Sequence, residues 1–388
     1  MPFLALSFGH FVVDALNGLT PVMIVAFSVP LGLGNAMVGL LSSLYGLAGA
    51  VFQPLFGLAS DRHGGAWASV GGLLWMGVFF TLACVTPVEL GVIFMLLAGI
   101  GPAAFHPAGT MDAADLSRRS LAGKAAAGTA LFFLFGQIGS ALGPAAGGAL
   151  LDLAGSPGLL AVVALCAPAA LLGVAFRNRE GSPALSRGSE RPGRLPLASL
   201  LSLELALILT VAVLRFWVQA STQTFVPKLM LDRGFSATTY GALAGVFMAG
   251  AAAGGVIGGF LADRYGNHPV ILGTTALSVV PLYLFPLASG PALAVLIAVT
   301  GVLNVAPHSI LVTMAQNALP GRSGLASGLI MGSMFTLGGV GILVTGLVAD
   351  RIGLMQVLQA NVFVCVLALG VGIWLWAVQR RRHLPGPA

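Results

Sequence analysis

The distribution of apolar residues along the chain predicts a series of long membrane-spanning helices. Apolar runs of about 20 residues, the length that a helix needs to cross roughly 30 Å of hydrocarbon, recur from the first residues to the last. Strands of a membrane barrel would instead alternate polar and apolar positions over about ten residues. We therefore expect twelve helices, at residues 4–29, 36–58, 67–87, 90–110, 121–150, 157–176, 197–226, 237–261, 269–288, 291–317, 323–349 and 354–378.

The composition indicates the same class of protein. Hydrophobic residues make up 57% of the 388 residues and charged residues only 8%, too few to cover the surface of a water-soluble protein of this size. The three cysteines, Cys84, Cys166 and Cys365, lie in predicted helices without metal-ligand spacing, so we interpret them as packing residues. We expect an all-α membrane protein with no cofactor and no bound metal.

The basic residues lie mainly on one side of the predicted membrane. Of the 18 Lys and Arg residues, all but Lys228, Arg233, Arg351 and the intramembrane Arg215 fall in loops or termini of that side. The positive-inside rule then places both termini and the central loop in the cytoplasm of a bacterial-type inner membrane. This asymmetry accounts for the net charge of +6 without a nucleic-acid partner.

Two parts of the sequence match closely enough to indicate a duplication. Residues 39–64 and 241–266 have equal length and share their first and last glycines and an Asp-Arg pair. His106 and His308 follow at the same offset of 202 residues. Duplicated bundles of this kind are typical of secondary transporters, which open alternately around a site near the middle of the membrane.

The duplication predicts the domain organisation. The one long run rich in polar, proline and serine residues, at 177–196, separates six predicted helices from the other six. We expect an N-terminal bundle at 1–176, a cytoplasmic linker at 177–196 and a C-terminal bundle with a short basic tail at 197–388.

The segments 57-GLASDRHGG-65 and 259-GFLADRYGN-267 resemble the signature that the major facilitator superfamily carries between helices 2 and 3 and again between helices 8 and 9. The resemblance covers essentially the whole chain and implies two pseudo-symmetric six-helix bundles in a monomer. Glycine lets helices approach closely, and an aspartate at a helix end can cap backbone N–H groups. The resemblance implies a cytoplasmic gating latch of Gly57, Asp61, Arg62, Gly259, Asp263 and Arg264.

The predicted fifth helix carries 139-GSALGPAAGG-148, which resembles the pattern of proton-coupled drug antiporters in this superfamily. Its small residues would form a flat packing face, and its proline would introduce a kink. Ordinary packing of small residues is the alternative. The residues of the pattern are Gly139, Gly143, Pro144, Gly147 and Gly148.

Two shorter stretches, 8-FGHFVVDALNGLTP-21 and 104-AFHPAG-109, resemble the fosmidomycin-resistance branch of these exporters. The resemblance in these two motifs supports the branch and leaves the substrate open.

Two charged residues, Asp14 and Arg215, occupy nearly equivalent places in the predicted first and seventh helices. Because an ionised group at the bilayer centre costs about 2.5–3.5 kcal/mol, we expect both to face a central cavity. We predict that Asp14 is the principal proton-binding group, and that Arg215 is either its counter-ion or the contact for an anionic substrate. A purely structural salt bridge is the alternative.

Histidines accompany the predicted proton site. His10 lies one turn before Asp14, and imidazole changes its charge near neutral pH, so we assign His10 and His106 to proton coupling. For His106 and His308, a structural hydrogen bond to a neighbouring backbone group is the alternative. A zinc site is disfavoured because these ligands come from different helices without a close-spaced pair. The expected substrate contacts, besides Arg215, are Asn17, Gln53, Gln137, Gln219, Gln223, Asn304 and His308.

Together these features predict a proton-coupled efflux antiporter that moves a small organic compound, anionic or amphipathic, by alternating access. The partners we expect are this substrate, protons and the lipid bilayer. A uniporter or importer of a small organic anion or nutrient is the first alternative, and a non-transporting membrane receptor is the second. Because nucleophile-elbow, zinc-protease, P-loop and paired-cysteine signatures are absent from the sequence, we expect no enzymatic activity.

Overall fold

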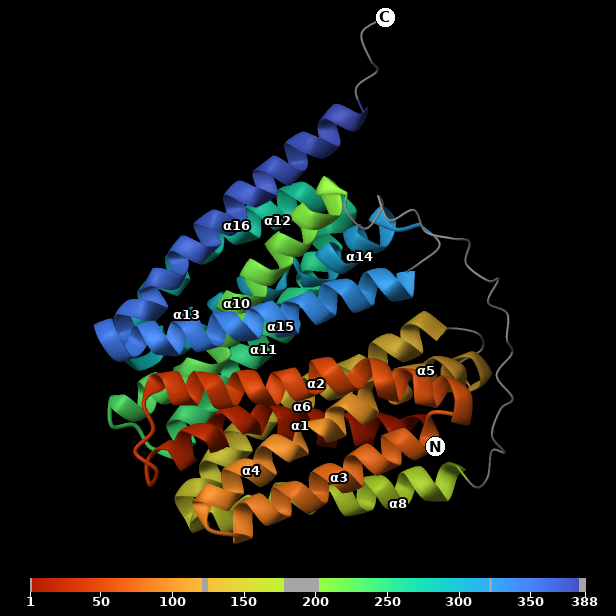
Figure 1. Ribbon diagram of the computed structural model, residues 1–388, viewed down its shortest axis with the longest axis vertical. Helices are drawn as coiled ribbons and strands as arrows, with labels where there is room; N and C mark the ends of the chain where they lie inside the picture. Colours follow the sequence, from red (N-terminus) through yellow and green to blue (C-terminus); the bar gives the residue numbers. More distant parts are fainter. Residues whose placement is uncertain (1, 121–124, 178–201, 321–322, 384–388) are drawn as a thin grey trace, which may run out of the picture. The chain divides into compact units, whose positions relative to one another are not determined.

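The computed structural model describes residues 2–120, 125–177, 202–320 and 323–383, which are almost entirely helical (Figure 1). The elements in chain order are α1 (Pro2–Ser28), α2 (Asn35–His63), α3 (Ala66–Val85), α4 (Val88–Ala98), α5 (Ile100–Ser120), α6 (Ala125–Gly158), α7 (Leu160–Val163), α8 (Cys166–Arg177), α10 (Leu203–Asp232), α11 (Ala237–Tyr265), α12 (Asn267–Leu284), the short 3-10 helix η1 (Phe285–Leu287), α13 (Gly290–Val305), α14 (His308–Ala318), α15 (Ser323–Ile352) and α16 (Leu354–His383).

Within the described part of the chain, 11 helical stretches are long and apolar enough to cross a membrane. α4 and α5 together form one of them, Val88–Ser117, and α13 and α14 form another, Gly290–Ala318. A shorter apolar stretch, Leu160–Ala175, stands in the place of the predicted sixth helix. The prediction of an all-helical membrane protein with twelve membrane helices is confirmed, and the described residues contain no strand.

α6 is interrupted near its end, between the predicted fifth and sixth helices at 121–150 and 157–176. Ala154 (φ −147°, ψ 16°) and Gly155 (φ 63°, ψ −157°) have non-helical dihedral angles, whereas Pro144 lies in a helical part of α6. Glycine reaches a positive φ without the steric penalty that other residues meet. The break at Gly155 therefore falls between the predicted fifth and sixth helices, at a residue suited to the conformation, and the kink predicted at Pro144 stays a prediction.

Packing groups the described residues into two compact units. The first unit contains those within Met1–Arg187 together with Gln223–Ala249, and the second contains those within Gly188–Thr222 and Gly250–Ala388. α10 and α11 are therefore shared, because the end of α10 and the start of α11 pack within the first unit. Apart from Arg177, the predicted linker lies outside the described residues.

In the first unit, α1 is the central helix. It packs against α2, α3, α4, α5, α6, α7 and α8, and Figure 1 shows it among these helices. Its most apolar stretch is 72% buried inside the protein, the largest share among the described spans. A helix buried on all sides turns its polar side chains toward neighbouring helices rather than lipid.

The second unit has its own apolar core. Ile208 of α10 packs there with Ile271 of α12, Leu311 of α14, Ile330 of α15 and Leu375 of α16. These side chains are almost completely buried. The core keeps α10 fixed among the other helices of the unit, which matters for the buried Arg215 described below.

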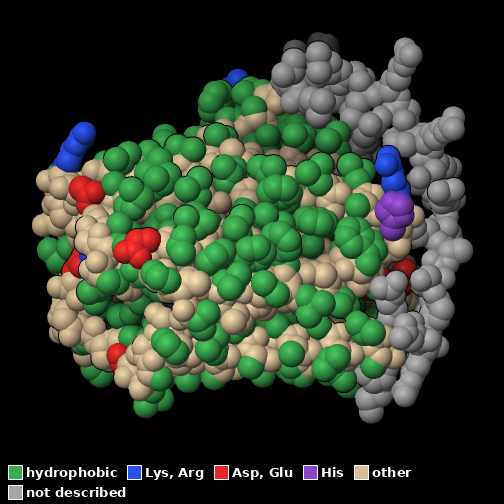
Figure 2. Space-filling view, turned by 60° about the horizontal axis from the view of Figure 1, so that its bottom comes forward, with side chains coloured by type: hydrophobic (Ala, Val, Ile, Leu, Met, Phe, Trp, Pro, Cys, Tyr) green, Lys and Arg blue, Asp and Glu red, His purple; other side chains and the backbone are tan. Residues whose placement is uncertain are grey.

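The surface suits a hydrocarbon environment. Figure 2 shows that hydrophobic side chains cover the middle of the visible face, while acidic and basic side chains gather toward its left and right ends. Large side chains such as Phe260 and Phe363 are 73% and 76% exposed. Helices satisfy their own backbone hydrogen bonds, so lipid can contact such a surface without leaving polar groups unpaired.

Candidate functional site

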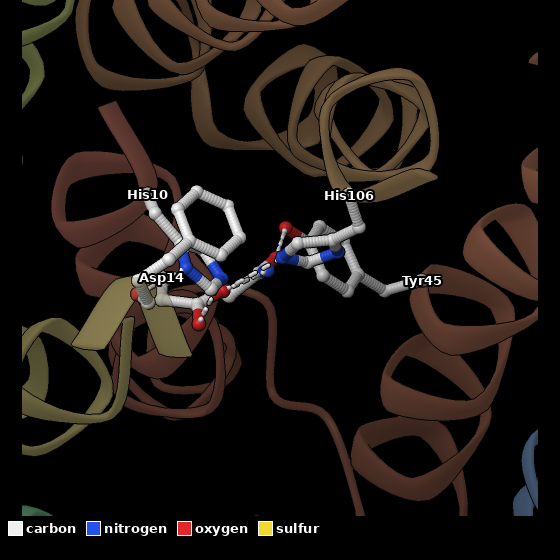
Figure 3. Close-up of polar contacts among 6 residues, drawn as sticks. His10, Asp14, Tyr45 and His106 are labelled. Carbon is white, nitrogen blue, oxygen red and sulfur yellow. Dashed lines mark hydrogen bonds and ion pairs between the residues drawn. The ribbon is translucent and has the colours of Figure 1, made fainter. Parts of the chain in front are cut away.

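Three side chains converge in the first unit: His10 and Asp14 from α1, and His106 from α5. His106 Nε2 lies 3.0 Å from Asp14 Oδ1, and His10 Nε2 lies 3.3 Å from Asp14 Oδ2. Figure 3 shows these residues together with Tyr45. Each carboxylate oxygen thus has one imidazole beside it. We call these three residues the His-Asp-His cluster.

The local sequence explains this convergence. Residues four apart on an α-helix lie one turn apart on the same face, which places His10 beside Asp14. α5 packs against α1, so His106 reaches the same carboxylate from a second helix. The sequence alternative of a structural bond from His106 to a neighbouring backbone carbonyl is not what the structure shows, because its Nε2 bonds to Asp14 instead.

A backbone carbonyl fixes one proton of His10. Nδ1 of His10 lies 2.8 Å from the carbonyl oxygen of Phe132 in α6, and because a carbonyl only accepts, Nδ1 must carry the hydrogen. The other ring nitrogen, Nε2, faces Asp14 Oδ2. An imidazole lone pair and a carboxylate oxygen repel each other unless a proton lies between them. The geometry therefore calls for one proton shared by His10 and Asp14.

Two further residues support the carboxylate. Asn17 Nδ2 donates to Asp14 Oδ1 at 3.3 Å, and the Tyr45 hydroxyl of α2 donates to Asn17 Oδ1 at 2.7 Å. Asn17 is one of the predicted substrate contacts, and the structure places it within reach of the predicted proton site. Tyr45 was not singled out from the sequence, because a tyrosine in an apolar helix carries no distinctive local signal.

The cluster is partly enclosed by aromatic rings. The ring of Phe132 stacks on His10 with centroids 4.1 Å apart, and Phe105 stacks on it at 5.9 Å. His10 is 2% exposed, Asp14 17% and His106 27%. His106 is therefore the most accessible member, and the proton shared with His10 lies on the buried side of the carboxylate.

Glycines allow α6 to lie directly against the cluster. A Cβ atom at Gly136 would lie 2.5 Å from Asp14 Oδ2 and 2.6 Å from His10 Nε2, closer than Cβ atoms come to their neighbours in real proteins. Further along α6, a Cβ at Gly139 would meet the carbonyl oxygen of Phe11 at 2.1 Å. Only a residue without Cβ permits this backbone contact. Gly136 thus extends the predicted antiporter pattern by one turn, to the cluster itself, and sequence analysis missed it.

The rest of the predicted antiporter pattern packs on α1 and on α11. A Cβ at Gly143 would meet the carbonyl oxygen of Ala15 at 2.0 Å, and one at Gly147 would meet Leu19 Cδ1 at 2.0 Å. On a different face of α6, a Cβ at Gly148 would lie 2.1 Å from a carbonyl oxygen of α11. The pattern therefore serves tight packing on both sides of α6 within the first unit.

Asp152, near the end of α6, accepts hydrogen bonds from the first residues of α11. Its Oδ1 lies 3.0 Å from the backbone nitrogen of Ala237, and its Oδ2 lies 2.7 Å from that of Thr238. A carboxylate in this place satisfies N–H groups that have no partner within their own helix. Asp152 thus fastens the start of α11 to α6.

Arg215 of α10 is buried in the second unit, with 3% of its surface exposed. Its Nη1 donates to Ser278 Oγ at 3.1 Å and contacts Cys365 Sγ at 3.6 Å. Its Nη2 donates to the carbonyl oxygens of Leu303, at 2.6 Å, and Asn304, at 3.0 Å. These partners are neutral groups of the second unit, whereas the hydrogen-bond partners described for Asp14 belong to the first. The predicted role of Arg215 as counter-ion or anion contact stays a prediction.

The other predicted substrate contacts are distributed over both units. The amide of Asn304 is buried, and neither its nitrogen nor its oxygen has a hydrogen-bond partner among the described residues. His308 is the first residue of α14 and is half-buried. The half-buried glutamines are Gln53 of α2, Gln137 of α6, and Gln219 and Gln223 of α10. The hydrogen bonds that the structure describes bring Asn17 to the cluster, but none of these residues.

The predicted latch residues lie at the ends of α2 and α11. Arg62, Asp263 and Arg264 are exposed, and the Arg264 guanidinium lies 5.4 Å from the centroid of the Tyr265 ring. The side chain of Asp61 lies outside the described residues. The helices that follow, α3 and α12, begin without a described side-chain cap. A gating role for these residues, with Gly57 and Gly259, stays a prediction.

The donor atoms of the His-Asp-His cluster lie within 4.8 Å of one another, a spacing that also suits a metal ion. His10 and Asp14 lie one turn apart on α1, which the sequence shows, but the third donor, His106, comes from α5, and no spacing in the sequence places it beside them. The absence of a metal stays a prediction.

Two segments of the chain, residues 6–237 and 208–388, match the family model described as Major Facilitator Superfamily. The chain belongs to the Major Facilitator Superfamily. The two matches cover both halves of the duplication, and they confirm the family that the signatures at the ends of α2 and α11 indicate. Members of this superfamily are multi-pass membrane proteins, and the apolar helices described above agree with that.

This superfamily member also resembles individual proteins along most of its length. It is 27% identical over 381 residues to the Fosmidomycin resistance protein of Escherichia coli (strain K12), covering 94% of this chain and 90% of that protein. It is 28% identical over 388 residues to the Uncharacterized MFS-type transporter YfnC of Bacillus subtilis (strain 168), covering 93% and 89%. These relatives confirm the predicted resemblance to the fosmidomycin-resistance branch and support a secondary transporter.

Solved structures share the superfamily fold. The chain aligns with a mutant of the nucleoside transporter NupG with a TM-score of 0.80 and 15% identity, covering 97% of this chain and 100% of that one. It aligns equally well, at 0.80 and 15%, with a bacterial homologue of the human lysosomal transporter Spinster in an inward-facing, unoccupied conformation, covering 100% and 98%. At these identities the comparison shows the fold alone.

Proposed function

We propose that this protein is a proton-coupled efflux antiporter and that the His-Asp-His cluster is its proton site. Superfamily membership supports secondary transport, and the relative named for fosmidomycin resistance supports export. One observation carries the proton coupling: His10 donates from Nδ1 to a carbonyl oxygen, so the contact between its Nε2 and Asp14 Oδ2 requires a further proton. A site that shares one removable proton is what coupling needs.

The cluster converts protonation into a change of packing. With the shared proton present, His10 and Asp14 together are neutral, and both imidazoles hold the carboxylate. When this proton leaves, the lone pair of His10 Nε2 faces a negatively charged oxygen, and the contact becomes repulsive. The titratable side chains that the structure places around Asp14 are His10, His106 and Tyr45. Proton loss therefore favours an arrangement in which α1 has shifted against α5 and α6.

Substrate binding and protonation are linked in this proposal. If the substrate binds better when Asp14 is deprotonated, each ligand lowers the affinity for the other by the same factor. The substrate is a small organic compound, anionic or amphipathic, and fosmidomycin, a phosphonate, is the first probe to use. The distribution of basic residues supports a bacterial inner membrane with both termini in the cytoplasm.

The test is transport by the purified protein in proteoliposomes that contain a trapped pH indicator. We expect an imposed pH gradient to drive fosmidomycin uphill, with protons moving in the opposite direction. Asp14→Asn removes the titratable group and should abolish this exchange. Glu89→Gln makes the same chemical change at an exposed carboxylate at the start of α4 and should transport normally.

The same assay separates the rival functions. Flux that ignores the pH gradient would indicate a uniporter, and fosmidomycin moving with the protons would indicate an importer. Binding of fosmidomycin without flux would indicate a receptor. Loss of exchange on adding EDTA, restored by zinc, would show that the cluster works through a metal rather than a shared proton.

A further inference from the structure

We propose that Arg215 is a positioning residue that stabilises the break between α13 and α14. Its positive charge is balanced by the partial negative charge at the end of α13 rather than by a carboxylate or a substrate. This role goes beyond the proposed function, because it concerns the second unit and does not depend on proton coupling.

The break leaves one carbonyl group without its helical partner. α13 ends at Val305 and α14 begins at His308. In an uninterrupted helix the carbonyl of Leu303 would accept from the N–H group four residues later. That residue is Pro307, which has no N–H group. The segment is apolar enough to lie in a membrane, where an unpaired carbonyl is costly.

Arg215 supplies the missing donor. Its Nη2 lies 2.6 Å from the carbonyl oxygen of Leu303 and 3.0 Å from that of Asn304. The last carbonyls of a helix carry a partial negative charge of roughly half an electron, which favours a cation at this place. The guanidinium therefore satisfies the orphaned carbonyl, and the end of α13 offsets the cost of burying its positive charge.

The remaining nitrogens leave little room for an anion. Nη1 donates to Ser278 Oγ and contacts Cys365 Sγ, so both terminal nitrogens are engaged. Only Nε has no hydrogen-bond partner among the described residues. Arginine usually grips a carboxylate or phosphonate through two parallel N–H groups. Here such a two-point contact would require breaking the hydrogen bonds from Arg215 to the carbonyl groups of α13 or to Ser278.

The first half of the duplication offers a natural comparison. At the offset of 202 residues, the position of Pro307 corresponds to Phe105, which has an N–H group. The residue nearly equivalent to Arg215 in that half is Asp14, which bonds to the side chain of His106 instead of to a backbone carbonyl. The arginine therefore occurs in the half that has proline at this position, whereas the first half keeps an N–H group there.

A double-mutant cycle tests this role directly. Arg215→Met should lower the melting temperature by roughly 5–10 °C, because the Leu303 carbonyl loses its donor. Pro307→Ala restores an N–H group at a position with helical angles (φ −76°, ψ −10°), so it should recover most of this loss in the Arg215→Met background. A thiol-reactive dye can follow unfolding, because Cys84, Cys166 and Cys365 are all free and buried.

A matched control uses another proline of the second unit. Pro281→Ala, within α12, makes the same change away from the Arg215 carbonyls and should not rescue Arg215→Met. If Arg215→Met does not fold, Arg215→Lys replaces it. The lysine keeps a single cationic donor for the carbonyls, and Pro307→Ala should stabilise this variant as well.

Transport separates a positioning role from mere stability and from substrate contact. In the double variant Arg215→Met/Pro307→Ala we expect KM for fosmidomycin within about twofold of the original and a maximal rate reduced roughly tenfold, because the break is lost. Full recovery of the rate along with stability would reduce Arg215 to a structural residue and overturn the proposal.

Two other results would also overturn it. One is the absence of rescue by Pro307→Ala. The other is a KM about tenfold higher for fosmidomycin in Arg215→Met with an unchanged melting temperature, which would make Arg215 a substrate contact. The melting experiments need no substrate, so they remain decisive even if fosmidomycin is not transported and the proposed function fails.

Discussion

The two oxygens of Asp14 have different surroundings. Oδ1 receives hydrogen bonds from Asn17 and His106, while Oδ2 faces only His10 among the described donors. The proton that can leave therefore lies on the Oδ2 side, next to a ring that is 2% exposed. His106, which contacts Oδ1, is 27% exposed and is the more accessible of the two rings. The two histidines should thus have separable effects.

We expect His10→Gln to abolish proton exchange and His106→Gln to slow it while keeping its stoichiometry. Glutamine can still donate a hydrogen bond, to Phe132 in the first case and to Asp14 in the second, but it cannot take up or release a proton. The measurement is proton and fosmidomycin flux between about pH 5 and 8, where imidazole changes charge.

The control is His63→Gln, which alters an exposed histidine at the end of α2 and should leave both fluxes unchanged. Equal inhibition by His10→Gln and His106→Gln would contradict separate roles for the two rings.

Close packing between α1 and α6 fixes the site. The glycines of α6 let its backbone touch α1, and Gly136 meets the carboxylate and imidazole themselves. Because the contact is between backbone and functional side chains, a small change in helix spacing reaches the cluster at once. The glycines of α6 therefore position the His-Asp-His cluster as well as packing the helices together.

Gly136→Ala should reduce the transport rate more than tenfold while the protein still inserts into the membrane, because the new methyl group displaces Asp14 or His10. Gly71→Ala in α3 is the matched control, since a Cβ there meets nothing within 4 Å. Both variants are assayed by flux and by membrane yield. Normal flux in Gly136→Ala would show that the packing at this point is not needed for coupling.

Sequence patterns predicted the helices well because a membrane helix requires only length and apolar character. They also predicted that His10 and Asp14 share a face, since helical spacing alone decides that. They could not predict the Phe132 carbonyl or Gly136 beside the cluster, because a contact between helices depends on packing that no local pattern contains. The break at Gly155, by contrast, lies in the short segment that separates the predicted fifth and sixth helices.

The duplicated halves have acquired different chemistry at related places. The first carries a titratable contact between α1 and α5, and the second carries a permanently charged one between α10 and α13. Arginine stays protonated at all physiological pH values, whereas histidine does not. In the proposed cycle, pH therefore acts through the first half.

The orientation of the whole chain can be checked independently. We expect a fluorescent protein fused after Ala388 to fluoresce in bacterial cells and a phosphatase fused there to be inactive, because the former requires the cytoplasm and the latter the periplasm. The basic residues Arg380, Arg381 and Arg382 at the end of α16 give the physical reason. An active phosphatase fusion would reverse the assigned topology.

The bond between Asp152 and the start of α11 joins segments from opposite halves of the duplicated sequence. If the gene were divided at the segment between α8 and α10, the first polypeptide would contain Asp152 and Gly148. The residues of α11 that contact them would belong to the second polypeptide. The start of α11 therefore takes part of its packing from the first half of the sequence, although each half repeats the same six-helix plan. Ancestral fusion of the two copies would have secured a contact that separate chains could form only by meeting in the bilayer.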